Sequence, residues 1–225
     1  MSHYFSRVQL IEHPQDLALL TALSRHGEAY RDHALVWQLF PGEGMPRDFL
    51  FRREVDGSGK DFYYVVSQRP PQARANLLAL QSKAYTPRLE VGEWLRFDLR
   101  ANPTVARRSE ATGKSQRHDV LMDAKRQAAD LPEQEQIDRI QQAGLSWIEQ
   151  RAASWGLVIR RESVLTNAYV QHKLHHKGRH IAFSSLDYQG VAQVTDPDLL
   201  AASLTTGVGH ARAFGCGLLL VRRAG

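Results

Sequence analysis

The stretch DFLFRREVDGSGKDFYYVVSQ, from Asp48 to Gln68, decides the fold. Two runs rich in aromatic and β-branched residues, Asp48 to Val55 and Asp61 to Gln68, flank the tripeptide Gly57-Ser58-Gly59. Strand-forming runs separated by a short glycine-containing turn are typical of a β-hairpin. The sequence therefore predicts two antiparallel strands here.

The segments on either side of this hairpin complete a unit. Tyr4 to Ile11 alternates apolar and polar residues, which predicts a strand, and Pro14 to Phe40 carries leucines at helical spacing, which predicts a helix. After the hairpin, a short helix is expected over Gln72 to Leu80 and a strand over Lys83 to Glu90. The predicted order is βαββαβ.

The second half of the chain repeats this order without repeating its sequence. The expected elements are a strand at Glu93 to Arg100, a helix at Glu133 to Ala153, strands at Leu157 to Val164 and His180 to Val194, a helix at Asp198 to Thr205, and a strand at Gly217 to Arg222. We therefore predict an α+β protein of two tandem ferredoxin-like (βαββαβ, RRM-like) domains, over residues 1–90 and 91–225. This architecture carries RNA binding, metal binding and many enzymes, so it leaves function open.

Composition narrows the class of protein. A single cysteine, Cys216, excludes an intrachain disulfide, and the longest aliphatic run near either end, Leu218 to Val221, is too short to span a bilayer. The first residues also lack the basic start and apolar block of a secretory signal. We expect a soluble, cytoplasmic protein without membrane contact.

Positive charge is concentrated in two segments of a chain whose net charge is +5. Residues 100–126 contain seven Lys or Arg and three acids, and residues 151–180 contain six Lys or Arg, one acid and four histidines. Segregated positive charge favours a surface for a polyanion. Two solvated basic loops without a ligand are the alternative.

The run GVGHARAFGCGLL, from Gly207 to Leu219, contains four glycines within eleven positions: Gly207, Gly209, Gly215 and Gly217. Glycine permits positive φ and close backbone approach, so such a loop can offer amides to phosphate or pack tightly on a sheet. The spacing fits neither a Walker loop nor a dinucleotide-binding fingerprint.

This glycine-rich loop before a short apolar strand resembles the signature of the CRISPR repeat-associated RNA-binding (RAMP) proteins. Tyr30-Arg31-Asp32-His33 is similar to the tyrosine and histidine of CasE-branch (type I-E) endoribonucleases, and Asp48 to Phe51 resembles the second strand of that family. Leu95 to Pro103, followed by Thr112-Gly113-Lys114, resembles its arginine-bearing strand and basic loop. The resemblance spans nearly the whole chain in colinear order. It implies a metal-independent endoribonuclease, without a cofactor, that cleaves CRISPR precursor RNA beside a repeat hairpin.

The first helix carries a stripe of candidate catalytic residues. At about 100° per residue, His26, Tyr30, His33 and Trp37 fall within roughly 60° of one another, apart from the packing residues of the helix. RNA supplies its own nucleophile, the 2′-hydroxyl, so the protein needs a base for that proton and an acid for the departing 5′-oxygen. Histidine can serve either role near neutral pH. We assign His33 as general base or acid, Tyr30 as its partner, and His26 as a weaker candidate. A solvated or partly packed helix edge is the alternative.

The segment Tyr169 to His180 lies where the family has a basic hairpin that grips the RNA stem, and it is rich in histidine, which predicts tighter binding toward pH 6. A tetrahedral metal site from His172, His175, His176 and His180 is an alternative that we disfavour, because no cysteine or carboxylate joins the cluster. The candidate RNA-binding cations are Arg96, Arg100, Arg107, Arg108, Lys114, Lys173, Lys177, Arg179 and Arg212.

The expected partners are the CRISPR repeat hairpin and, by resemblance, other subunits of a type I-E interference complex. Two rival functions remain. One is an RNA-binding subunit of such a complex that does not cleave, and the other is a structural protein whose basic loops dock acidic subunits.

Overall fold

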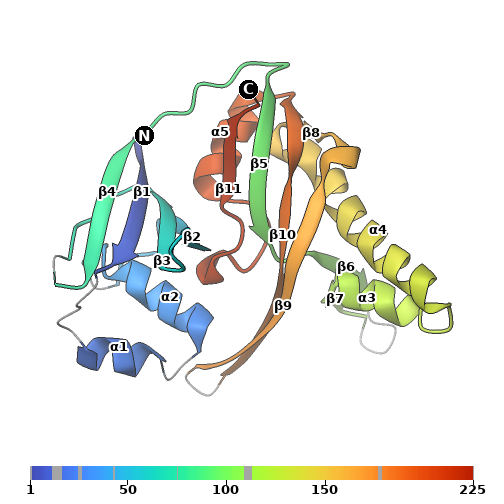
Figure 1. The fold of residues 1–225 in the computed structure, drawn as a ribbon, viewed down its shortest axis with the longest axis horizontal. Coiled ribbons are helices and arrows are strands. Elements are labelled where there is room, and N and C mark those ends of the chain that lie inside the picture. The colour runs from blue at the N-terminus through green and yellow to red at the C-terminus, as the bar shows by residue number, and fades with distance from the viewer. Residues whose placement is uncertain are drawn as a thin grey trace.

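The computed structural model describes residues 2–11, 17–24, 27–42, 44–74, 76–108, 113–176 and 179–224, apart from the side chains of Ser24, His175, His176 and Arg179. It is an α+β protein in which two antiparallel sheets stand side by side, each with helices on one face (Figure 1). Within these residues no helix is long and apolar enough to cross a membrane.

The first sheet contains β1 (His3–Leu10), β2 (Phe49–Val55), β3 (Asp61–Ser67) and β4 (Leu78–Tyr85) in the order β2-β3-β1-β4. All neighbouring strands are antiparallel. The hairpin predicted over Asp48 to Gln68 is confirmed. Its turn is closed by the Asp56 carboxylate, which accepts hydrogen bonds from the amides of Ser58 at 2.9 Å and Lys60 at 3.0 Å.

The helix expected over Pro14 to Phe40 is two helices, α1 (Leu17–Ser24) and α2 (Glu28–Trp37). The continuous helix was wrong because Gly27, just before α2, has φ of 88°, a left-handed value incompatible with a right-handed helix. The buried residues Leu35, Val36 and Leu39 pack α2 and the turn after it on the sheet.

The helix predicted over Gln72 to Leu80 is also wrong. Residues 78–85 form β4, which pairs with β1 from Leu78↔Leu10 to Tyr85↔His3. A helix here would leave the backbone groups along this edge of β1 without partners, a cost that outweighs a weak helical pattern. The strand expected at Lys83 to Glu90 therefore begins five residues earlier and ends at Tyr85.

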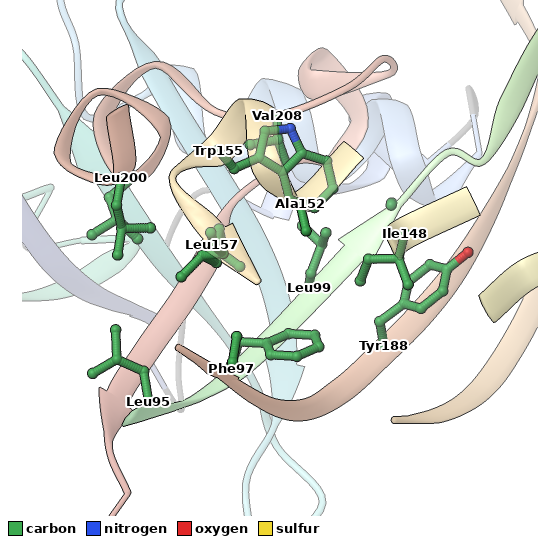
Figure 2. Close-up of a cluster of buried hydrophobic side chains, with 14 of the residues drawn as sticks. Leu95, Phe97, Leu99, Ile148, Ala152, Trp155, Leu157, Tyr188, Leu200 and Val208 are labelled. Atoms are coloured by element: carbon green, nitrogen blue, oxygen red, sulfur yellow. The ribbon is translucent and has the colours of Figure 1, made fainter. Parts of the chain in front are cut away.

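The second sheet contains β5 (Trp94–Ala101), β8 (Leu157–Ile159), β10 (Arg179–Val194) and β11 (Leu219–Arg223) in the order β11-β5-β10-β8, and β9 (Leu165–His176) pairs with β10. Helices α4 (Glu133–Ala152) and α5 (Pro197–Thr206) cover one face. In both sheets the first and third strands of the unit lie in the middle, and the fourth strand lies beside the first, as β4-β1-β3-β2 and β11-β5-β10-β8. The prediction of tandem ferredoxin-like units is therefore confirmed. Leu99, Ile148, Tyr188 and Leu200 meet in the core of this unit (Figure 2).

The second unit differs from the prediction in several elements. A hairpin of β6 (Thr104–Arg108) and β7 (Ser115–Asp119) and helix α3 (Val120–Gln127) lie between β5 and α4. Strand β8 ends at Ile159, short of the predicted Val164, because the 3₁₀ helix η2 (Arg161–Ser163) follows it. Two further 3₁₀ helices, η1 (Ala153–Trp155) and η3 (Arg212–Phe214), follow α4 and precede β11.

The two units meet through a buried ionic cluster. Arg52 of β2 is only 2% exposed and pairs with Asp98 of β5 at 2.6 Å and with Glu54 beside it. Arg100 of β5 donates two hydrogen bonds of 2.7 Å to Asp187 of β10, and a third to the carbonyl of Arg53 at 3.1 Å. These ion pairs and hydrogen bonds hold the first sheet against the second.

Candidate active site and nucleic-acid interface

Helix α2 is held against the first sheet by a buried carboxylate. Asp32 accepts a hydrogen bond of 2.8 Å from the hydroxyl of Tyr63 on β3, and Arg53 lies 3.7 Å away. Burial raises the pKa of Asp32, and the hydrogen bond from Tyr63 opposes this effect. These contacts fix the rotation of α2 about its axis, and with it the side on which Tyr30 and His33 lie.

His33 lies in an aromatic cluster where α2, β2 and η3 meet. The indole N–H of Trp37 donates a hydrogen bond to His33 Nε2 at 2.9 Å. The rings of Phe49, Phe51 and Phe214 lie 6.2 to 6.4 Å from the imidazole, centroid to centroid. Tyr30, His33 and Trp37 of the expected stripe are half-buried on α2.

The other two catalytic candidates are less defined. Tyr30 is half-buried and lies three residues before His33, on the same side of α2. His26 lies outside the described residues.

The four glycines of the C-terminal loop have positive φ, between 68° and 84°. At Gly217 a Cβ would lie 2.3 Å from the carbonyl oxygen of Val208, and at Gly207 it would lie 2.7 Å from Leu50 on β2. The loop therefore packs tightly against the first sheet, and this packing brings Phe214 to the His33 ring. Arg212 of the same loop donates to the carbonyl of Thr206 at 2.7 Å.

A cleft of about 430 Å³, here called the α2 cleft, opens between the units beside this cluster. Glu28, Ala29 and Asp32 of α2, Arg53 and Arg100 of the two sheets, His172 of β9, and Phe214 are among its lining residues. Strand β9 is irregular here, because its register with β10 shifts between Ser185 and Asp187 and Ala168 has φ of 51°. Such a bulge re-aims neighbouring side chains, often beside functional sites.

His172 shares a hydrogen bond of 2.9 Å between its Nε2 and Ser185 Oγ, and stacks on Phe183 at 4.4 Å. Burial, and then the charge of Arg100, lower the pKa of His172. Phe183 in turn stacks on Phe214 at 5.2 Å. A row of rings thus runs from β9 to His33.

The hairpin expected around Tyr169 to His180 is confirmed as the paired strands β9 and β10, which extend beyond the sheet as a long ribbon (Figure 1). Lys173 is exposed on it. Lys177 and the side chain of Arg179 lie outside the described part of the chain, as do the side chains of His175 and His176. Across the residues that are described, no three His, Cys, Asp or Glu side chains form a metal-binding group.

The remaining candidate cations lie in different settings. Arg96 is exposed on β5, and Arg107, Arg108 and Lys114 are exposed on or beside the β6–β7 hairpin. Arg107 pairs with Asp123, and Arg108 Nε donates to the carbonyl of Gly113 at 3.0 Å. Arg100 differs from the others, since its guanidinium is held by Asp187 in the cluster that joins the units.

Several site residues escaped the sequence prediction. Phe183 and Phe214 are ordinary apolar residues in the sequence, and only tertiary packing sets them beside histidines. Arg117 was counted only as part of a basic segment, and Asn102 carried no signal of its own. All four lie around a second cleft, of about 610 Å³, on the other side of the ring row.

Comparison with known proteins gives a consistent result. A family model described as CRISPR associated protein matches residues 3–223. The CRISPR-associated endoribonuclease Cse3 of Thermus thermophilus is 30% identical over 208 residues, covering 90% of this chain and 86% of that protein. The CRISPR system Cascade subunit CasE of Escherichia coli is 27% identical over 199 residues, covering 85% of this chain and 90% of that protein. A solved structure of the CRISPR endoribonuclease Cse3 bound to a 19-nucleotide RNA has the same fold, with a TM-score of 0.70, 24% identity, and coverage of 98% of this chain and 99% of that one.

Proposed function

Because this chain belongs to the family of CRISPR-associated proteins, we propose that it is an endoribonuclease that processes CRISPR precursor RNA. It binds the repeat hairpin and cleaves at the 3′ base of the stem, with the 2′-hydroxyl next to the scissile phosphate as nucleophile. No metal takes part in this reaction. The cleaved guide RNA then stays bound within a type I-E interference complex, as the name of the related Cascade subunit suggests.

The observation that carries this proposal is the position of His33. It lies beside the α2 cleft, between the two units, and its Trp37 hydrogen bond holds Nε2 as an acceptor. The neutral imidazole therefore carries its proton on Nδ1. This bond sets the tautomer and the orientation of the ring at the junction of the units. Once the ring reaches the RNA, it can take up the proton of the 2′-hydroxyl or give a proton to the departing 5′-oxygen, the two steps that the reaction requires.

Tyr30 supplies a hydroxyl on the side of the helix that carries His33. It can orient the 2′-hydroxyl or donate a hydrogen bond to the developing charge on the phosphate. The products are a 2′,3′-cyclic phosphate, or a 3′-phosphate after the ring opens, and a 5′-hydroxyl.

The charged surface supports binding of an RNA stem. Cations of the β6–β7 hairpin and Lys173 of the β9–β10 ribbon are exposed on the second unit. The narrow major groove of A-form RNA excludes most elements, but a thin ribbon with basic side chains can contact phosphates at the end of a short stem.

One observation favours the second candidate function, an RNA-binding subunit that does not cleave. Four aromatic rings surround His33, and Trp37 occupies its Nε2. Catalysis requires the imidazole to reach the RNA from this enclosure, by a rotation of the ring or a shift of η3 when RNA binds. A binding subunit needs no such movement.

Cleavage of the repeat RNA in excess EDTA separates the two functions. We expect the parent to cut once and leave a 5′-hydroxyl, and we expect His33→Ala, or a 2′-deoxy nucleotide at the scissile position, to abolish cutting without loss of RNA binding. A general acid or base typically contributes about 10² to 10⁴ in rate. If the parent binds the hairpin but does not cut it, the non-cleaving subunit replaces the proposal. If His33→Ala cuts at the parental rate, the catalytic site lies elsewhere.

A further inference from the structure

The second cleft, here called the β7 cleft, lies between β7, β9, β10 and the loop before η3. His172 and Phe214 line both this cleft and the α2 cleft, so the two are separated by the thickness of the ring row. The roles assigned above use Lys173 at the rim of the β7 cleft for phosphate contacts, and they leave its interior without a role.

The amide of Asn102 lines this cleft and is 8% exposed. Its Oδ1 has no hydrogen-bond partner among the described residues. An unpaired buried polar group costs about 1 to 3 kcal/mol, and a native structure that keeps one has a reason for it.

The backbone around Asn102 holds this amide in place. The carbonyl of Pro103 accepts from the amide of Val120 at 3.0 Å, and the carbonyl of Thr104 accepts from Trp147 at 3.1 Å and from Arg151 at 2.9 Å. The chain directly after Asn102 is therefore fixed, which keeps the amide at the wall of the cleft.

The polar rim of the cleft is cationic. Arg117 of β7 and Lys173 of β9 are exposed, and no salt bridge to either is found among the residues that the structure describes. His210 lies with them, and burial, followed by the charges of Arg117 and Arg212, lowers its pKa. Asp119 also lines the cleft, but its carboxylate accepts hydrogen bonds from the hydroxyl of Tyr169 at 2.8 Å and from the amides of Leu121 and Met122 in the first turn of α3.

We propose that the β7 cleft binds one unpaired nucleotide of the RNA that the α2 cleft holds, with Arg117 and Lys173 on its phosphate and the Asn102 amide on the edge of its base. This inference rests on the proposed function. A fixed amide, an apolar wall with Phe183, and cations at the rim are what a single extruded nucleotide requires. The amide makes the cleft selective between bases, whereas the cations act on any RNA.

The test is a scan of the repeat RNA with single abasic nucleotides, made uncleavable by a 2′-deoxy substitution at the scissile position. Binding is measured by fluorescence anisotropy for the parent, Asn102→Ala and Arg117→Ala. Arg139→Ala, which removes an exposed charge from α4, is the matched control.

We expect one abasic position outside the stem to weaken binding to the parent about tenfold, since one good contact to a base edge contributes about 1 to 3 kcal/mol. Asn102→Ala should bind the intact RNA about tenfold more weakly and show no further loss at that position. Arg117→Ala should weaken binding to every RNA by a similar factor, and Arg139→Ala should match the parent.

Two results overturn the inference: no sensitive position in the parent, or a parental pattern in Asn102→Ala. The thermal unfolding temperature of each variant shows whether it is folded. Arg117 lies on the surface, so Arg117→Ala tests the cleft without a change in the core. Failure of the proposed function is distinct, because the parent would then leave the cleavable repeat RNA uncut in EDTA, or would bind the repeat hairpin no better than a scrambled hairpin. The abasic scan uses uncleavable RNA and does not depend on cutting.

Discussion

The indole N–H of Trp37 donates to Nε2 of His33 at 2.9 Å, one helical turn apart on α2. The bond fixes both the tautomer and the orientation of the imidazole. Trp37 also packs edge-to-face on Phe49, with centroids 5.0 Å apart, so its own ring is held in place.

Trp37→Phe keeps a ring in this position and removes the donor. We expect kcat for RNA cleavage to fall on the order of 10- to 100-fold with little change in KM, because the imidazole loses its preset geometry. Single-turnover cleavage and RNA binding measure the two effects. Trp94→Phe, at an exposed position of β5, is the control. An unchanged kcat in Trp37→Phe would show that the bond has no role in catalysis.

Tyr30→Phe removes one hydroxyl from the face of α2 that carries His33. We expect about a 10- to 100-fold loss in the cleavage rate, with RNA affinity within a factor of two, because the hydroxyl acts on the reacting groups. Tyr64→Phe, on β3, removes a hydroxyl outside the α2 cleft and should leave the rate unchanged. Equal rates for the two variants would exclude Tyr30 from catalysis.

Gly217→Ala tests the packing of the glycine-rich loop. The new Cβ would meet the Val208 carbonyl at 2.3 Å with φ at +83°, so we expect a loss of about 3 kcal/mol or more in the free energy of unfolding. Gly209 also has positive φ but nothing within 4 Å of its Cβ position, so Gly209→Ala should cost only about 1 kcal/mol. Urea denaturation compares them, and similar losses would contradict the packing argument.

Arg52→Met tests the ionic cluster between the units. The substitution removes the buried guanidinium that pairs with Asp98 and Glu54, and we expect a loss of about 3 to 5 kcal/mol in the free energy of unfolding at neutral pH.

The loss of folding stability in Arg52→Met should depend on pH. Burial already raises the pKa of Glu54 in the folded protein, with Arg52 as the largest opposing influence. Without Arg52, the folded state favours the protonated carboxyl still more, so the destabilisation should grow as pH rises above the ordinary carboxyl range and shrink below it. Urea denaturation at about pH 5 and pH 8 checks the sign. A loss that is larger at the lower pH would rule out this account.

RNA affinity should depend on pH through two histidines that lie in the clefts. Burial is the main cause that lowers the pKa of both His172 and His210, and nearby arginines lower it further. Each ring therefore gains charge only below the ordinary histidine value of 6.5, and its contribution to RNA binding should appear as pH falls below that value. Fluorescence anisotropy titrations at several pH values measure the RNA affinity of the parent, His172→Gln and His210→Gln. If both variants keep the parental pH profile, these two histidines do not cause the pH dependence.

The sequence alone determined the elements whose pattern is local. Alternation in β1, the aromatic and β-branched runs of β2 and β3 around a glycine turn, and the helical spacing in α4 are all visible in short stretches of sequence, since the side-chain period follows from backbone geometry. The stripe of Tyr30, His33 and Trp37 was visible for the same reason. Residues four apart on a helix are neighbours in any fold.

Only the tertiary structure decided the features that depend on distant residues. Strand β4 exists because the edge of β1, about seventy residues earlier, needs partners for its backbone groups. Arg100, a candidate RNA ligand by composition, instead binds Asp187 across the sheet. The ring row of His172, Phe183, Phe214 and His33 brings together four elements, β9, β10, η3 and α2. The buried amide of Asn102 becomes notable only because its oxygen has no hydrogen-bond partner among the described residues. Burial and pairing are properties of the packed chain, and no local period encodes them.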